Sequence, residues 1–277
     1  MFGAGLRPPR AELETREGMD AWIDTYHAVR RLTSQGTFVF LTDSAVGAAE
    51  EDNLRHLVTN LGHDAPRQRI VPFLTTKHPL DYCLSYAERA HQSGFPALVV
   101  LGGDKSVGAP RSVEHAWRLR QLLRERDHTL TLGGWANPHA DPERQVDFLT
   151  AADFHGEFYL TQIVSHHQMP AVSGFLDAVR RRGLTLPGVF GVFFYRSANA
   201  RTLATLKDFL PVPAEGLTRE FGEGQSAEDV CARTIRALLD AGARHFYISN
   251  LPIGRTSQVL DAILTRAGVR PKLRGEN

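Results

Sequence analysis

The chain has 277 residues, and its 32 Lys and Arg nearly balance its 31 Asp and Glu, giving a formal charge of +1. This balance argues against a dedicated nucleic-acid-binding protein, because such proteins concentrate basic residues for phosphate contacts. Hydrophobic residues make up 42% of the chain and charged residues 23%, which excludes a disordered chain and is enough for a full core. No apolar run approaches the roughly 18–20 residues of a membrane helix, so no membrane partner is expected.

The N-terminal residues and the two cysteines both bear on the cellular compartment of the protein. The first ten residues lack the basic start and apolar run of a secretory signal. The cysteines, Cys83 and Cys231, are far apart in the sequence and are expected to be two separate buried thiols. These features predict a cytoplasmic protein.

Strand-like and helical patterns alternate along the chain. The strand-like segments are almost continuously apolar, which is typical of parallel strands covered on both faces. They span residues 2–6, 38–42, 69–74, 97–101, 129–132, 158–161, 189–193 and 245–248.

The segments between these strands have helical spacing, for example residues 54–61 and 230–239. Eight repeats of strand and helix in about 250 residues predict an α/β fold of one domain, a single (β/α)8 TIM barrel over residues 1–277. A doubly wound open sheet is the alternative, because periodicity does not show whether a sheet closes. Residues 212–225, rich in Pro and Gly, are expected to form a mobile lid or a long connection.

In a TIM barrel the chemistry lies at the C-terminal ends of the strands. Gly103 and Asp104 follow the most apolar strand, where a glycine admits a ligand close to the backbone and an aspartate supplies an acceptor or acid. Trp135 and His139 could stack on a flat heterocycle and donate to it. The structural alternatives are a turn in which Asp104 caps the next helix, and a loop shaped by its Asn-Pro turn.

Two further strand ends carry candidates. The amide of Gln162 can read donor and acceptor positions of a ring edge, or bond the neighbouring backbone instead. Tyr195 lies in an aromatic cluster of which at least one ring is expected to be core.

Metal binding and the common nucleotide motifs are not expected. His155, His166 and His167 lack ligand spacing, and adjacent histidines on a loop are expected to project in different directions. No dinucleotide-binding glycine motif, phosphate-binding loop or nucleophile elbow occurs in the sequence.

The order of the strand-end motifs resembles methylenetetrahydrofolate reductase along nearly the whole chain. The motifs that carry the resemblance are Pro72-Phe73-Leu74-Thr75, Leu101-Gly102-Gly103-Asp104, Trp135 through His139, Leu160-Thr161-Gln162, Leu186-Pro187-Gly188-Val189 and His245 through Asn250. The resemblance implies a TIM barrel that reduces 5,10-methylenetetrahydrofolate to 5-methyltetrahydrofolate with NADH or NADPH, usually with bound FAD.

The resemblance also implies roles for individual residues. Asp104 would be the catalytic carboxylate and would contact the folate, and Thr42, Gln162 and Tyr195 would also contact the folate substrate. Gly103, Trp135, His139 and Gln162 would bind the cofactor.

The chain departs from the family pattern at several positions. Gly5 stands where the family has the glutamate that acts as the acid, so Asp104 or Asp43 would have to replace it, or the reaction has changed. Phe73 and Gly102 stand where a flavin-binding histidine and arginine are usual, and the expected lysine is missing from residues 145–154. These changes favour the atypical flavin-independent actinobacterial branch. An FAD-dependent reductase and a non-catalytic folate-binding relative are the alternatives.

Overall fold

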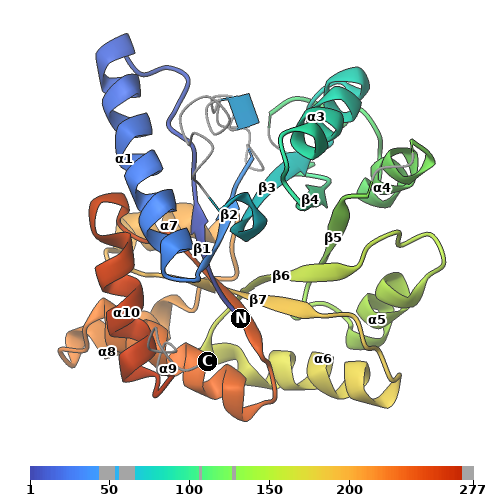
Figure 1. The fold of residues 1–277 in the computed structure, drawn as a ribbon. Helices are drawn as coiled ribbons and strands as arrows, with labels where there is room; N and C mark the ends of the chain where they lie inside the picture. The colour runs from blue at the N-terminus through green and yellow to red at the C-terminus, as the bar shows by residue number, and fades with distance from the viewer. Residues whose placement is uncertain (44–53, 56–65, 106–107, 127–128, 270–277) are drawn as a thin grey trace, which may run out of the picture.

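Eight parallel strands form a closed barrel, which confirms the predicted TIM-barrel fold (Figure 1). The computed structural model describes residues 1–43, 54–55, 66–105, 108–126 and 129–269. The strands pair in chain order, and β8 closes the barrel against β1. They are β1 (Phe2–Leu6), β2 (Phe38–Leu41), β3 (Ile70–Thr75), β4 (Ala97–Leu101), β5 (Thr131–Ala136), β6 (Phe158–Val164), β7 (Gly188–Phe193) and β8 (His245–Ser249).

Helices lie around the outside of the barrel (Figure 1). The α-helices are α1 (Thr15–Ser34), α3 (Leu80–Gln92), α4 (Ala116–Glu125), α5 (Pro142–Thr150), α6 (Met169–Arg181), α7 (Ala200–Lys207), α8 (Ala214–Gly222), α9 (Ala227–Asp240) and α10 (Thr256–Arg266). Within the described residues, three short 3-10 turns precede β3, α6 and α10: η1 (Arg67–Arg69), η2 (His166–Gln168) and η3 (Ile253–Arg255). The helix expected over 54–61 lies largely outside the described residues; Leu54 and Arg55 are helical.

The predicted strand boundaries are wrong at β5 and β6. Gly133 and Gly134 were expected to end the strand but lie inside β5, since the rings of Phe158 and Phe154 occupy the space where their side chains would be. Likewise Gln162 lies inside β6 rather than at its end. The two glycines look like a turn in the sequence, but here they are strand residues that leave room for neighbouring rings.

The segment 212–225, expected to be a mobile lid or a long connection, is not a plain connection, because α8 occupies most of it. Pro213 stands at the N-cap of this helix, where its missing N–H costs nothing, and Gly224 follows the helix with a φ of 83°. The Pro and Gly residues therefore delimit a helix instead of preventing one.

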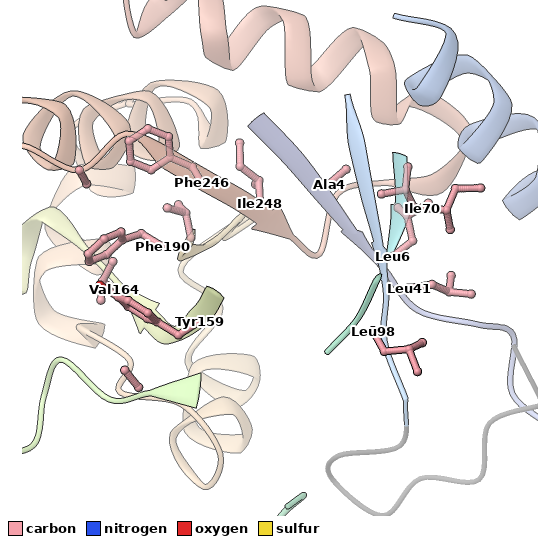
Figure 2. Close-up of a cluster of buried hydrophobic side chains, with 14 of the residues drawn as sticks. Ala4, Leu6, Leu41, Ile70, Leu98, Tyr159, Val164, Phe190, Phe246 and Ile248 are labelled. Carbon is pink, nitrogen blue, oxygen red and sulfur yellow. The ribbon is translucent and has the colours of Figure 1, made fainter. Parts of the chain in front are cut away.

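Side chains alternate between the two faces of each strand, so the barrel has an outer and an inner hydrophobic core. The outer core lies between the strands and the helices, and Figure 2 shows side chains from several strands contributing to it, among them Leu6, Leu41 and Phe190. The inner core fills the barrel. Its buried side chains are Phe40, Val71, Phe73, Ala97, Val99, Leu101, Leu160, Ile163, Val189 and Tyr247.

Glycines inside the barrel make room for the aromatic rings of the inner core. A Cβ on Gly3 would lie 2.6 Å from the Phe40 ring, and a Cβ on Gly191 would lie 2.9 Å from the Tyr247 hydroxyl. The rings of Phe40 and Tyr247 lie 5.5 Å apart between centroids, so large and small residues interlock across the barrel.

Two simpler expectations can also be compared with the structure. Cys83 and Cys231 are buried free thiols, as predicted. None of the helices in the described residues has the length and apolar character needed to cross a membrane.

Candidate functional site

The C-terminal ends of all eight strands meet at one mouth of the barrel, because the strands are parallel. The predicted site residues belong to this mouth through β2, β4, β5, β6 and β7. They are Thr42, Gly103, Asp104, Trp135, His139, Gln162 and Tyr195.

The ends of β2 and β3 hold an aspartate and a histidine in direct contact. Asp43 Oδ2 accepts hydrogen bonds from the backbone N–H of Thr75 at 2.7 Å and from its hydroxyl at 2.9 Å. His78 Nε2 lies 2.8 Å from Asp43 Oδ2 and 2.9 Å from Oδ1. Since an ionised carboxylate only accepts, His78 carries its proton on Nε2 and donates it to Asp43. The pair is accessible, with the His78 side chain 32% exposed and that of Asp43 12% exposed.

Thr42 fastens the end of β2 to β1. Its backbone N–H and its hydroxyl both donate to the carbonyl oxygen of Leu6, at 2.9 and 3.2 Å. The hydroxyl of Thr42 therefore bonds the backbone of β1. The folate contact that the family resemblance implies for this residue stays a prediction.

The end of β4 is lined by two basic side chains. A Cβ on Gly102 would lie 2.6 Å from the guanidinium carbon of Arg111, and a Cβ on Gly103 would lie 2.8 Å from the Lys77 side chain. Gly103 has a φ of 70°, a conformation that favours glycine. Asp104 follows at once and is half-buried. The glycine pair thus turns the chain and gives Arg111 and Lys77 room beside it.

Arg111 brings a guanidinium to the end of β4 beside Gly102. It donates to the carbonyl of Gly103 and, at 3.0 Å, to the carbonyl of Glu114. Its buried Nε has no hydrogen-bond partner within the described ranges. The strand end therefore carries a positive charge that comes from the loop after β4.

Trp135 and His139 differ in their surroundings. Trp135 is half-buried and packs against the inner core of the barrel. His139 Nε2–H donates to the carbonyl oxygen of Ile163 at 2.9 Å, which ties the loop after β5 to β6. Its backbone N–H donates to Asn137 Oδ1 at 3.1 Å, so the Asn-Pro turn holds this loop in shape.

Gln162 lies at an irregularity in β6, where the pairing with β7 shifts between Leu160 and Ile163. Its amide oxygen accepts from the N–H of Ile163 at 2.9 Å. Its amide nitrogen donates to no group in the part of the chain that the structure describes. Such irregularities re-aim side chains next to sites, and this one leaves the amide N–H groups available.

Tyr195, two residues beyond β7, is almost fully buried in a small core formed with side chains of α7, α8 and α9. Burial raises the pKa of its hydroxyl above the ordinary value. That hydroxyl lacks a hydrogen-bond partner among the described residues. Its ring lies 4.8 Å from that of Phe193, so the residue is both a packing element and an unsatisfied polar group.

Position 5, where the resemblance to methylenetetrahydrofolate reductase implies an acid, is a glycine close to neighbouring side chains. A Cβ on Gly5 would lie 3.3 Å from Ser249 Cβ and 3.3 Å from the Tyr247 ring. This position therefore holds no acid, and a side chain there would need its neighbours to shift by a few tenths of an ångström.

A second polar cluster lies just past the end of β6, where η2, α8 and α9 meet. Nε2 of His166 lies 3.0 Å from Glu220 Oε1, and Nε2 of His167 lies 2.9 Å from Glu220 Oε2. Arg233 also contacts Glu220 Oε1. The expectation that the adjacent histidines diverge is wrong, since their rings lie 4.0 Å apart between centroids, tilted by 37°, and both face Glu220. His155 is not part of this cluster.

Sequence reasoning gave no role to His78, Arg111 or Glu220. His78 does follow the end of a predicted strand, which is a usable signal. Arg111 and Glu220 reach their places through a loop and a helix whose paths depend on tertiary packing.

The chain matches no protein-family model and no curated protein. Solved structures resemble it in fold. A protein from Clostridium thermocellum, described as binding two copies of 5-methyl-5,6,7,8-tetrahydrofolic acid, superposes with a TM-score of 0.64 at 14% identity, covering 96% of this chain and 93% of its own. An F420-dependent secondary alcohol dehydrogenase in complex with an F420-acetone adduct gives a TM-score of 0.55 at 11% identity, over 95% and 98% of the two chains. At these identities the likeness establishes the (β/α)8 barrel fold.

Proposed function

We propose that this protein reduces 5,10-methylenetetrahydrofolate to 5-methyltetrahydrofolate with a reduced nicotinamide. The observation that carries the proposal is the His78–Asp43 pair at the mouth of the barrel, a protonatable group where position 5 offers none. The fold is that of a barrel described as binding 5-methyltetrahydrofolate, which supports a folate ligand.

The reaction needs one proton and one hydride. The bond between the bridge carbon and N10 breaks when N10 takes a proton, leaving an iminium at N5, and a hydride from the nicotinamide then converts the bridge carbon to a methyl group. In this proposal the imidazolium of His78 supplies the proton from Nδ1, while Asp43 holds the Nε2–H and orients the ring. The products are 5-methyltetrahydrofolate and oxidised nicotinamide, so the electrons balance.

The other site residues position the two ligands. Gln162 offers its amide N–H groups to the pterin or nicotinamide edge, and Asp104 accepts from the folate as the site carboxylate. Trp135 supplies an aromatic surface, and Gly103 lets a ligand approach the backbone. Hydride transfer then depends on holding donor and acceptor carbons about 3–3.5 Å apart.

The Arg111 guanidinium beside Gly102 favours a second candidate, an FAD-dependent form of the same activity. A cationic group at this strand end can make charge-assisted bonds to a diphosphate. The visible spectrum of the purified protein distinguishes the two, because bound flavin absorbs in the visible range and nicotinamide does not.

The decisive experiment measures NADH and NADPH oxidation with 5,10-methylenetetrahydrofolate and no added flavin, on protein whose visible spectrum has been recorded. Turnover without a flavin band supports direct hydride transfer. Folate binding by calorimetry without turnover, with FAD supplied, would leave a folate-binding protein. If neither folate nor nicotinamide binds, the proposal is wrong.

Replacing Gln162 with alanine should weaken folate binding about tenfold, since a hydrogen bond from its amide to the ligand contributes roughly 1.4 kcal/mol. Calorimetry with 5-methyltetrahydrofolate measures the change. Gln92→Ala on the exposed face of α3 is the matched control and should bind like the parent protein. Equal affinities for both variants would remove Gln162 from the site.

Replacing Asp104 with asparagine should lower kcat/KM roughly 10- to 100-fold, the loss expected for one hydrogen bond to a charged group. The fold should persist, because Asp104 is only half-buried and lies in a loop after β4. Steady-state kinetics and circular dichroism measure the two quantities. Unchanged kcat/KM would exclude Asp104 from the mechanism.

A further inference from the structure

His166, His167 and Glu220 bring three donor atoms within 4.8 Å of one another. Two ligands bound to one zinc ion at about 2.0–2.1 Å, at angles between 90° and the tetrahedral value, lie roughly 2.9–3.3 Å apart. The two observed histidine-to-carboxylate distances, 3.0 and 2.9 Å, fall within this range. The spacing therefore suits both hydrogen bonds and a shared metal ion.

The contacts of His166 hold its ring in place beside Glu220. Thr234 Oγ1 lies 2.8 Å from His166 Nδ1 and 3.4 Å from the backbone nitrogen of His166. These contacts direct Nε2 of His166 at Glu220 Oε1. When Nδ1 carries the proton and donates it to Thr234, Nε2 has a lone pair that can bind a metal ion.

Arg233 leaves room for such an ion. It contacts only Oε1 of Glu220, and its other terminal nitrogen donates to Gln225 Oε1 at 3.0 Å. Oε2 therefore stays directed at His167. Hydrogen bonds of this kind to a ligating carboxylate, and of Thr234 to His166, are what orients metal ligands in proteins.

The helix α8 places both Glu220 and a glycine beside the histidines. Glu220 and Gly216 are four residues apart and so share one face of the helix. A Cβ on Gly216 would lie 2.5 Å from both Cε1 and Nδ1 of His167, so only glycine lets the ring take this position. Glu220 is 4% exposed and the two histidines are 11% and 15% exposed, so the three side chains are largely shielded from water.

We propose that the protein binds a divalent transition-metal ion, zinc foremost, through Nε2 of His166, Nε2 of His167 and the carboxylate of Glu220. Two imidazoles and one carboxylate suit zinc better than magnesium or calcium, which prefer oxygen ligands. Three protein ligands leave a fourth position for water or another small ligand. The site stands whether or not the protein acts on folate, because none of its residues takes part in the proposed reduction.

The test is metal binding to the full chain after treatment with a chelator. Titration with zinc against a chromophoric competitor should give one equivalent bound, with a dissociation constant of about 1 μM or tighter. Cobalt in place of zinc should give visible absorption bands of a four-coordinate ion. His167→Asn should weaken zinc binding by more than roughly 100-fold and abolish these bands, because even changes to groups behind the ligands cost about 10–100-fold.

A second pair of variants distinguishes damage to the metal site from unfolding of the protein. Gly216→Ala should weaken zinc binding about tenfold by displacing the His167 ring, whereas Gly222→Ala in the same helix has open space and should bind like the parent protein. Circular dichroism confirms that each variant is folded. Absence of stoichiometric zinc binding, or binding that His167→Asn and Gly216→Ala leave unchanged, would overturn the proposal.

Discussion

Replacing Asp43 with asparagine is expected to lower turnover of 5,10-methylenetetrahydrofolate about 10²–10⁴-fold. The asparagine oxygen can still accept from the N–H of Thr75, so the end of β3 keeps its place. Its NH2 group would instead face His78 Nε2 and donate to it. His78 would then be held in the wrong tautomer, and its protonated form would lose the negative charge that stabilises it.

Steady-state kinetics across pH measure this effect separately from a structural one. The variant should lose kcat while folate affinity, measured by calorimetry, stays within a few-fold. Asp147→Asn, on the exposed surface of α5, is the matched control. Wild-type turnover in Asp43→Asn would show that the His78–Asp43 pair does not supply the proton.

Replacing Phe40 with alanine is expected to lower the free energy of unfolding by about 3–5 kcal/mol. Phe40 is buried inside the barrel, where its ring packs edge-on against Phe73 at 6.3 Å and lies 5.5 Å from Tyr247. Gly3 has no side chain to fill the space that the ring would leave. The cavity would therefore persist, and its cost adds to the lost burial.

Urea denaturation followed by circular dichroism and fluorescence measures the change. Phe148→Ala on α5 removes the same atoms from a side chain that is 52% exposed and should change stability by less than about 0.5 kcal/mol. Similar effects of the two substitutions would contradict the packing of the inner core described above.

The barrel itself could be predicted from the sequence because its strands are continuous apolar runs. Strands such as 97–101 and 2–6 keep their predicted boundaries in the structure. The boundary of β5 could not be predicted, since Gly133 is a strand residue only because Phe158 packs against it, and that contact joins two strands. Local patterns thus indicate which segments are strands better than they indicate where a strand ends.

The sequence named candidate site residues but not their contacts. From expected strand ends and the family resemblance it led to Gln162 and Asp104, whose roles stay predictions. It could not show that the Thr42 hydroxyl is bonded to Leu6, or that Arg111 comes back to Gly102 from a loop. These contacts depend on the positions of neighbouring strands and loops. Residue types and their spacing in the sequence do not indicate those positions.

The same reason explains why the polar cluster beyond β6 was missed. His167 and Glu220 are 53 positions apart and meet only because α8 forms. The glycines and Pro213 in that segment made a helix look unfavourable, although they stand at its boundaries or, like Gly216, where a neighbouring ring requires glycine.

The crowding at Gly5 has a consequence for the history of the barrel. A side chain added at position 5 needs Tyr247 and Ser249 to shift by a few tenths of an ångström, because its Cβ would lie 3.3 Å from each. The shift would fall on the β1–β8 seam, where Gly5 and Ser249 pair. Relatives that carry an acid at this position are therefore expected to place the residues equivalent to Tyr247 and Ser249 slightly farther from β1.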